Sequence, residues 1–359
     1  MITNSSVIRS ATIIITSYNY AEFIGEAIAS ALSQTFPNVE VIVVDDGSTD
    51  DSLNVIRSFG ERVVLLAQEN MGAPAAESAG FDRATGDLIL VLDSDDVLYP
   101  TAIEEAAALF DADTSKVQFF LDVVDAATSP LGFTFPQEMP REEDIEKLLF
   151  QFGCYQSPPT SGNAYSRRFL RQVLPYPEMV GTCTDLYAAV LAPLYGKVKV
   201  CEKILGGYRI HGRNMHSTMP GAVPTLREIR TTVVSGEGTQ RALEAHCAKL
   251  NKPIQHGLHW KWSHYCKLRL VSLKADQATH PFPEDRPFKL AWRGLVAIFM
   301  HRDPTLSNQS YRIFLFLLFL LLPLLPTRFV IFRFLFNGRA RLMGILQRLF
   351  RAPFGRAPS

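Results

Sequence analysis

The first hundred residues alternate between short apolar runs and segments whose apolar or small residues recur at helical spacing. Four runs are typical of buried strands: 12–16, 39–44, 62–66 and 88–92. The intervening segments predict helices at 22–33, 51–59 and 72–84. Repeated strand–helix units of this length require a largely parallel sheet with right-handed crossovers, so the pattern predicts a Rossmann-like α/β domain.

The fourth run, Leu88–Leu92, stops at three carboxylates, Asp93, Asp95 and Asp96. In open α/β sheets, ligands bind beyond the carboxyl ends of the strands, so acids at this point face a site. A single Asp96 would be read more readily as the cap of the next helix than as a ligand. Three neighbouring acids repel one another and raise one another's pKa, and a divalent cation removes this cost. The stretch therefore predicts a site for Mg²⁺ or Mn²⁺.

Two loop residues follow other strands of the same predicted edge. Tyr18 is placed to stack on a base, although loop tyrosines commonly pack on their own domain. Asp46 is placed to accept hydrogen bonds from a uracil or ribose, or to form an Asx turn before Gly47. Together with the three acids, they suit a nucleotide diphosphate and its metal. Neither GxGxxG nor GxxxxGK[ST] follows a strand here, which excludes the usual dinucleotide-binding folds and P-loop NTPases.

Charge divides the 359 residues unevenly, although the formal net charge is zero. The segment 285–359 has twelve Lys and Arg against two Asp and Glu, so the rest of the chain carries −10. Basic residues interleaved with large apolar ones are typical of an in-plane helix on an anionic membrane, and they favour a membrane over nucleic acid as the partner. A buried core helix is the alternative.

Within this tail, Ile313–Pro326 is a run of fourteen residues without a charge. As a helix it would reach about 21 Å, short of the roughly 30 Å hydrocarbon core, so an in-plane or re-entrant arrangement is expected. The five cysteines are odd in number and lack CxxC spacing, which argues against a disulfide framework or zinc site. No signal-peptide pattern opens the chain, and we expect the catalytic part in the cytoplasm.

Several short motifs resemble, in order and spacing, those of the family 2 glycosyltransferases with the GT-A fold. The resemblance covers roughly residues 8–217. Its motifs are Thr16-Ser17-Tyr18-Asn19, Ser33-Gln34-Thr35-Phe36, Val43-Val44-Asp45-Asp46-Gly47-Ser48-Thr49-Asp50, Asn70-Met71-Gly72 and Leu92-Asp93-Ser94-Asp95-Asp96.

The resemblance implies roles for the residues at the strand ends. Thr16, Tyr18 and Asp46 would hold the uracil and ribose of a UDP-sugar. Asp93 and Asp95 match the DxD pair, in which Asp95 would coordinate the metal bridging the diphosphate and Asp93 would contact ribose or assist. Asp96 would share the metal, as the equivalent acid does in some members.

The resemblance extends to the second half of this region. Residues 159–165 match the segment under the donor sugar and acceptor, and Asp185 falls on the acid that serves as general base. Thr184 stands where the family usually has glutamate, and Glu77 where many members have arginine. His211 would lie near the diphosphate or metal. From the residues alone, Asp185 reads equally as a helix cap and His211 as an ordinary loop histidine.

The expected organisation is a GT-A domain at 1–217, with a nucleotide-sugar half (1–100) and an acceptor half (101–217), then a helical segment at 218–284 and a membrane-associating tail at 285–359. The expected activity is metal-dependent, inverting transfer of a sugar from a UDP-sugar to a glycan or lipid-linked acceptor at the cytoplasmic face of a membrane. The alternative is a catalytically silent nucleotide-sugar-binding partner of a polysaccharide-assembly complex, suggested by Thr184 and Glu77.

Overall fold

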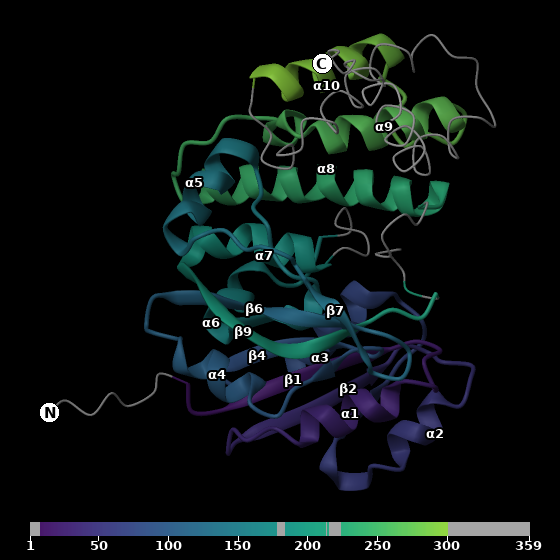
Figure 1. Ribbon diagram of the computed structural model, residues 1–359, viewed down its shortest axis with the longest axis vertical. Coiled ribbons are helices and arrows are strands. Elements are labelled where there is room, and N and C mark those ends of the chain that lie inside the picture. Colours follow the sequence, from purple (N-terminus) through teal and green to yellow (C-terminus); the bar gives the residue numbers. More distant parts are fainter. Residues whose placement is uncertain (1–7, 178–183, 213, 215–223, 301–359) are drawn as a thin grey trace, which may run out of the picture. The chain divides into compact units, whose positions relative to one another are not determined.

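The computed structural model describes residues 8–177, 184–212, 214 and 224–300 (Figure 1). The chain forms two compact units. The first comprises Met1–His211 and Ser235–Leu258, and the second comprises Gly212–Val234 and His259–Ser359. Each unit is described separately below.

The first unit begins with the predicted strand–helix alternation. Its elements are β1 (Ala11–Ser17), α1 (Ile24–Leu32), β2 (Val39–Asp45), α2 (Ser52–Arg57), a 3-10 turn (Gly60–Arg62), β3 (Val64–Ala67), α3 (Ala73–Arg83) and β4 (Leu88–Asp93). β1 pairs in parallel with β2 and β4, and β2 pairs in parallel with β3. The predicted parallel arrangement of these four strands is confirmed. β3 begins later than expected because the 3-10 turn takes up Arg62.

The second half of the sheet is mixed rather than parallel. Its elements are β5 (Val97–Leu98), α4 (Ala102–Ala108), β6 (Thr114–Val124), β7 (Pro130–Phe135), α5 (Glu142–Phe152), a 3-10 turn (Thr160–Gly162), β8 (Asn163–Ser166), α6 (Arg167–Val173), α7 (Thr184–Tyr195) and β9 (Lys197–Arg209). The strand order is β3-β2-β1-β4-β8-β6-β9-β5, with β7 paired to β6. β8 runs antiparallel to both β4 and β6, whereas β9 runs parallel to β6.

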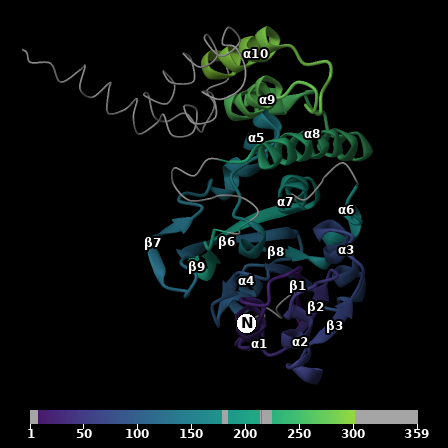
Figure 2. The same cartoon turned by 90° about the vertical axis from the view of Figure 1, so that its right-hand side faces the viewer.

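Helices cover both faces of this sheet (Figures 1 and 2). A hydrophobic core lies on each face of the sheet, and alternate residues of β1 point into one or the other. Ile13 and Ile15 pack in the core that includes residues of α1, and Ile14 packs in the core that includes residues of α3. α3 approaches β1 closely at Gly80, where an added Cβ would lie 2.5 Å from Ile14 Cγ2. The apolar run of β4 is buried throughout, as its sequence predicted.

The described part of the second unit is mainly helical. It contains the first part of α8 (Leu226–Lys249), a 3-10 turn (Leu258–Lys261), α9 (Ser263–Ala275) and α10 (Pro287–Met300). Its core includes Ile229 and Val233 of α8, Leu270 of α9 and Leu290 of α10. None of the helices in the described part of the chain has the length and apolar character to cross a bilayer. The run Ile313–Pro326 and the rest of 301–359 lie outside the described residues.

Candidate active site

The carboxyl ends of β1, β2 and β4 bring the first predicted site residues to one edge of the sheet. In the strand register, Thr16 of β1 is opposite Asp93 of β4, and Ser17 is opposite Asp45 of β2. Tyr18 and Asp46 follow directly on β1 and β2. Three stretches that are far apart in sequence thus end side by side, as the alternating pattern predicted.

Asp96 is held by the protein through both carboxylate oxygens. Its Oδ1 accepts a hydrogen bond from the backbone N–H of Arg209 at 2.9 Å, and its Oδ2 accepts one from Ser161 Oγ at 2.6 Å. The residues after Asp96 form β5, and the next helix begins at Ala102, so the helix-cap interpretation of Asp96 is wrong. This carboxylate fixes the turn after β4.

Ser161 is a site residue that sequence reasoning missed. Its hydroxyl is fully buried, accepts a hydrogen bond from the backbone N–H of Asp93 at 3.1 Å and donates one to Asp96. One side chain therefore connects both ends of the acidic stretch to the 3-10 turn before β8. Its place in the matched segment 159–165 was the available signal, but no spacing rule pairs residue 161 with 93 and 96.

The Asp93 carboxylate lies close to several other acidic side chains. Burial raises its pKa well above the ordinary value, and the charges of Asp96, Asp95, Glu77 and Asp185 raise it further. Among the described residues, no side chain or backbone group donates a hydrogen bond to it. A positive charge brought by a ligand would relieve this repulsion.

His211 lies beside the acidic stretch. Its Nε2 is 3.0 Å from Asp95 Oδ2, and its ring stacks on Phe23 with centroids 4.5 Å apart. Tyr20 contacts the same ring edge-on at 5.8 Å. The imidazole is thus oriented by two aromatic side chains of the β1–α1 region, and its side chain is almost entirely buried.

Arg209 is a buried residue that holds the backbone of the site in place. Its guanidinium donates to the backbone oxygens of Asp95 at 2.6 Å and Ala126 at 2.7 Å, and to Glu26 Oε2 at 2.7 Å. It also lies over the ring of Phe23, 4.9 Å from the centroid. These contacts fix the backbone that carries Asp95 and His211. Arg213 lies outside the described residues.

Asp46 organises the loop between β3 and α3. Its Oδ1 accepts hydrogen bonds from Gln68 Nε2 at 2.8 Å and the Met71 N–H at 2.9 Å, and its Oδ2 accepts one from the Gly72 N–H at 2.8 Å. The Asx-turn alternative is wrong for Asp46, because its partners lie more than twenty residues away. Tyr18, by contrast, is 45% exposed at the same edge.

Asp185 lies in the first turn of α7, next to Thr184. Its charge contributes to raising the pKa of both Asp93 and Glu77, so α7 brings a carboxylate close to the end of β4. Glu77 Oε1 accepts a hydrogen bond from Thr184 Oγ1 at 2.6 Å, and Glu77 Oε2 accepts one from Tyr176 at 2.8 Å. The two residues that depart from the family pattern are therefore direct partners. Cys183 lies outside the described residues.

The residues at this edge fit a hard divalent cation that is shared with a phosphate ligand. Within the described ranges, no group of three or more His, Cys, Asp and Glu side chains is arranged around a common point as a metal centre. Asp95 and His211, however, form an adjacent oxygen and nitrogen pair. Mg²⁺ is commonly held by one or two protein carboxylates together with substrate phosphates, and this pair suits that mode.

Comparison with known proteins places the fold and the family. The structure of S. aureus TarS residues 1–349 in complex with UDP-GlcNAc is similar with a TM-score of 0.51 at 17% identity, over 88% of each chain. Another structure of S. aureus TarS gives a TM-score of 0.50 at 17% identity, over 88% of this chain and 53% of that one. This likeness shows a shared α/β fold of the GT-A type.

Sequence relatives agree with the fold. An uncharacterized glycosyltransferase of Nostoc sp. is 35% identical over 59% of this chain and 68% of its own length. One of Rickettsia prowazekii is 34% identical over 39% of this chain and 45% of its own length. Residues 12–169 match the model of the family described as glycosyl transferase family 2. With these matches and the arrangement at the ends of β1, β2 and β4, the chain belongs to glycosyltransferase family 2 and is a glycosyltransferase.

Proposed function

We propose that the enzyme transfers a sugar from a UDP-sugar to a glycan or lipid-linked acceptor, with inversion of the anomeric centre and with Mn²⁺ or Mg²⁺ as cofactor. The observation that carries this proposal is the meeting of carboxylates from separate elements. Asp93 and Asp95 come from the end of β4, Asp185 comes from α7, and the charge of Asp185 acts on Asp93.

The donor half of the proposal assigns the nucleotide to the ends of β1 and β2. Tyr18 would stack on the uracil through its exposed ring. Thr16 and Asp46 would contact the base and ribose, and Asp46 keeps one acceptor position beyond the three hydrogen bonds that it already accepts. The fold neighbour TarS was captured with UDP-GlcNAc, which makes a UDP-sugar the first donor to test.

The cofactor half assigns the metal to Asp95 and His211, with Asp93 on the adjacent ribose or phosphate. When bound, a divalent cation neutralises the negative charge that develops on the departing diphosphate. We leave Asp96 out of the ligand set, because its side chain is buried at 1% exposure and fixes the turn after β4 through Arg209 and Ser161.

Asp185 is the proposed general base. An acceptor hydroxyl is a poor nucleophile at neutral pH, and a carboxylate within hydrogen-bond reach takes its proton as the new bond forms. A single base opposite the leaving group produces one displacement and therefore inversion. Glu77 accepts hydrogen bonds from Thr184 and Tyr176, which holds the start of α7 where Asp185 stands.

The test is UDP release and sugar transfer, measured with and without Mn²⁺ for the wild type, Asp185→Asn and Asp95→Asn. We expect Asp185→Asn to lower transfer by about 10²–10⁴-fold while UDP still raises the melting temperature. Asp95→Asn should lose the Mn²⁺-dependent part of the UDP stabilisation. Asp82→Asn, an equivalent change at an exposed acid of α3, is the control. A wild type that binds UDP but neither transfers nor hydrolyses any donor in a panel of nucleotide sugars would instead favour the silent partner.

For the location, we propose that the catalytic unit works at the cytoplasmic face of a membrane, held there by residues 285–359. The support is the sequence of that segment, with twelve basic against two acidic residues among large apolar ones. An acceptor that is lipid-linked or part of a surface polysaccharide would then be presented from the same surface. Nucleic acid has no place in this proposal.

A further inference from the structure

α10 packs one apolar face on the described helices of the second unit, and a second face carries exposed aromatic side chains. Leu290, Ala291, Ala297 and Ile298 are buried, and the first two and the last belong to the core shared with α9. On the other face, Phe288 is 66% exposed, Trp292 is 67% exposed and Phe299 is 66% exposed. At about 100° per residue these three positions fall within about 40° of one another, so they form one aromatic stripe along the helix.

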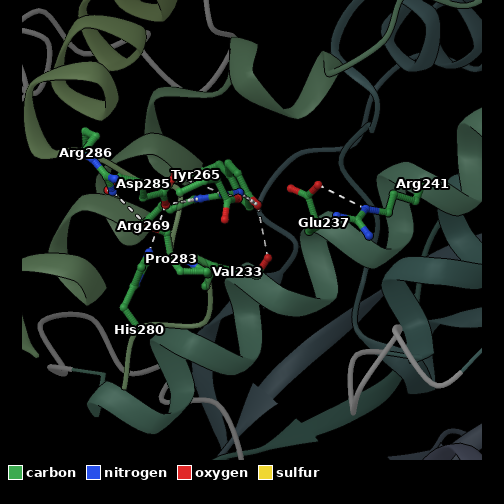
Figure 3. A network of polar contacts seen from close by, with 10 residues as sticks. Val233, Glu237, Arg241, Tyr265, Arg269, His280, Pro283, Asp285 and Arg286 are labelled. Atoms are coloured by element: carbon green, nitrogen blue, oxygen red, sulfur yellow. Dashed lines mark hydrogen bonds and ion pairs between the residues drawn. The ribbon is translucent and has the colours of Figure 1, made fainter. Parts of the chain in front are cut away.

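A buried polar network holds the start of α10 in place (Figure 3). Arg269 of α9 donates to Asp285 at 2.5 Å and 3.2 Å and to Glu284 at 3.1 Å, just before the helix begins. His280 Nε2 lies 3.0 Å from the same Asp285 carboxylate, and His280 Nδ1 lies 2.9 Å from Ser272 Oγ. The aromatic stripe is therefore carried on an anchored helix.

This network is structural despite its resemblance to a hydrolytic triad. Ser272, His280 and Asp285 form a hydrogen-bonded serine–histidine–aspartate chain, but the Ser272 side chain is fully buried within α9. A substrate has no access to that hydroxyl. Burial acts to raise the pKa of Asp285, but the hydrogen bonds with His280 and Arg269 and the charge of Arg269 outweigh it and lower that pKa. The function of the cluster is to fix the segment that leads into α10.

We propose that the aromatic stripe Phe288–Trp292–Phe299 is a membrane-docking face that seats the second unit on an anionic lipid surface. The inference deepens the membrane association proposed above and names the element that makes the contact. Tryptophan and phenylalanine are the side chains that insert at the level of the lipid headgroups. Among the described helices, α9 packs on the face of α10 that carries Leu290 and Ile298, and an exposed apolar patch rimmed by polar residues marks an interaction site.

Charge selects an anionic lipid surface as the occupant. Arg286 and Lys289 are exposed beside the stripe, and the sequence that continues from α10 carries nine further arginines and one aspartate among large apolar residues. Each basic residue near an anionic leaflet adds attraction to the lipid surface. The stripe supplies the apolar contact, and the flanking cations supply the preference for anionic lipid.

Flotation of the full chain with vesicles tests the proposal. The vesicles are phosphatidylcholine alone and phosphatidylcholine mixed with phosphatidylglycerol, and the variants are Phe288→Ser and Trp292→Ser, singly and together. We expect the wild type to float with the anionic vesicles and the double variant to partition at least about tenfold more weakly, because two large apolar side chains lose their burial. Leu131→Ser removes a 42%-exposed side chain of β7 and should leave flotation unchanged.

Tryptophan fluorescence provides a second measurement that does not depend on a destabilising variant. Trp260 and Trp262 are half-buried against the core of their unit, whereas Trp292 is exposed. Anionic vesicles should shift the wild-type emission to shorter wavelength, and brominated lipids should quench it. Trp292→Phe should abolish both changes, and Trp262→Phe should keep them.

Three results would overturn the proposal. The first is a wild type that does not float. The second is a double variant that floats as the wild type does, which would place the contact elsewhere in the chain. The third is a wild type that self-associates through the stripe and becomes monomeric in the double variant, which would make a second copy the occupant. Stabilisation by UDP and Mn²⁺, measured in the same preparations, separates a failure of docking from a failure of the proposed donor chemistry.

Discussion

Replacing Glu77 with glutamine is expected to change how the stability of the enzyme depends on pH. Glu77 is 5% exposed, and both of its carboxylate oxygens accept hydrogen bonds, from Thr184 and from Tyr176. Burial raises its pKa from 4.5 to about 7, the two hydrogen bonds oppose this rise, and the charge of Asp185 adds to it. A glutamine fits the same place without a charge, and its amide can accept from one hydroxyl and donate to the other.

The sign and size of the effect follow from linkage. Because the folded-state pKa is the higher one, the folded protein holds the proton more tightly, and the contribution of Glu77 to stability is full below about pH 4.5. It is lost as the pH rises and is gone above about pH 7. A difference of about 2.5 in pKa, at about 1.36 kcal/mol for each pH unit, corresponds to about 3 kcal/mol. Most of this loss, about 2.5 kcal/mol, falls between pH 5 and pH 8.

The assay is urea unfolding of the wild type and Glu77→Gln without nucleotide or metal, at pH 5, 6, 7 and 8. The free energy of unfolding of the variant minus that of the wild type should increase by about 2–3 kcal/mol from pH 5 to pH 8. The largest part of this increase should fall between pH 5 and pH 7. Glu61→Gln, the same change at an exposed residue of the turn before β3, should run parallel to the wild type. If Glu77→Gln also runs parallel, Glu77 is ionised throughout, and the burial argument is refuted.

Two further predictions concern residues that hold the site together. Ser161→Ala should lower the free energy of unfolding by about 2 kcal/mol, because it leaves the Asp93 N–H and one Asp96 oxygen without their partner. It should also lower transfer activity more than UDP affinity. Unfolding curves and donor titrations check this, and unchanged activity would contradict the bridging role. Asp46→Asn should lower the free energy of unfolding by about 1–3 kcal/mol and weaken UDP binding, because an amide group would face the N–H groups of the 68–72 loop. Calorimetric titration with UDP checks this prediction. A variant that binds UDP with wild-type affinity would count against the assignment.

Local patterns were sufficient to predict the edge that carries the site. The alternation of apolar runs and helical spacing fixes parallel strands, and parallel strands end at a common edge, so Tyr18, Asp46 and Asp93 come together for a reason that is visible in the sequence. The hydrogen bonds from Ser161 and Arg209 to Asp96 join residues 65 and 113 positions apart, and no periodicity encodes such pairs. The mixed half of the sheet was missed for the same reason, since β8 inserts between β4 and β6 from later in the chain.

The hydrogen bond between Glu77 and Thr184 changes the meaning of two apparent losses. Taken singly, the missing arginine at position 77 of α3 and the missing glutamate at position 184 of α7 suggest that the site has lost activity. The structure joins the two positions through a 2.6 Å hydrogen bond, with Tyr176 as a third member and with the charge of Asp185 acting on Glu77. The carboxylate at this point is thus supplied by Glu77 of α3 instead of by a residue of α7. Thr184 donates a hydrogen bond to it, where a glutamate at position 184 would repel it. A linked exchange of this kind preserves the placement of Asp185, whereas two independent losses would not, so the exchange supports an active transferase over a silent partner.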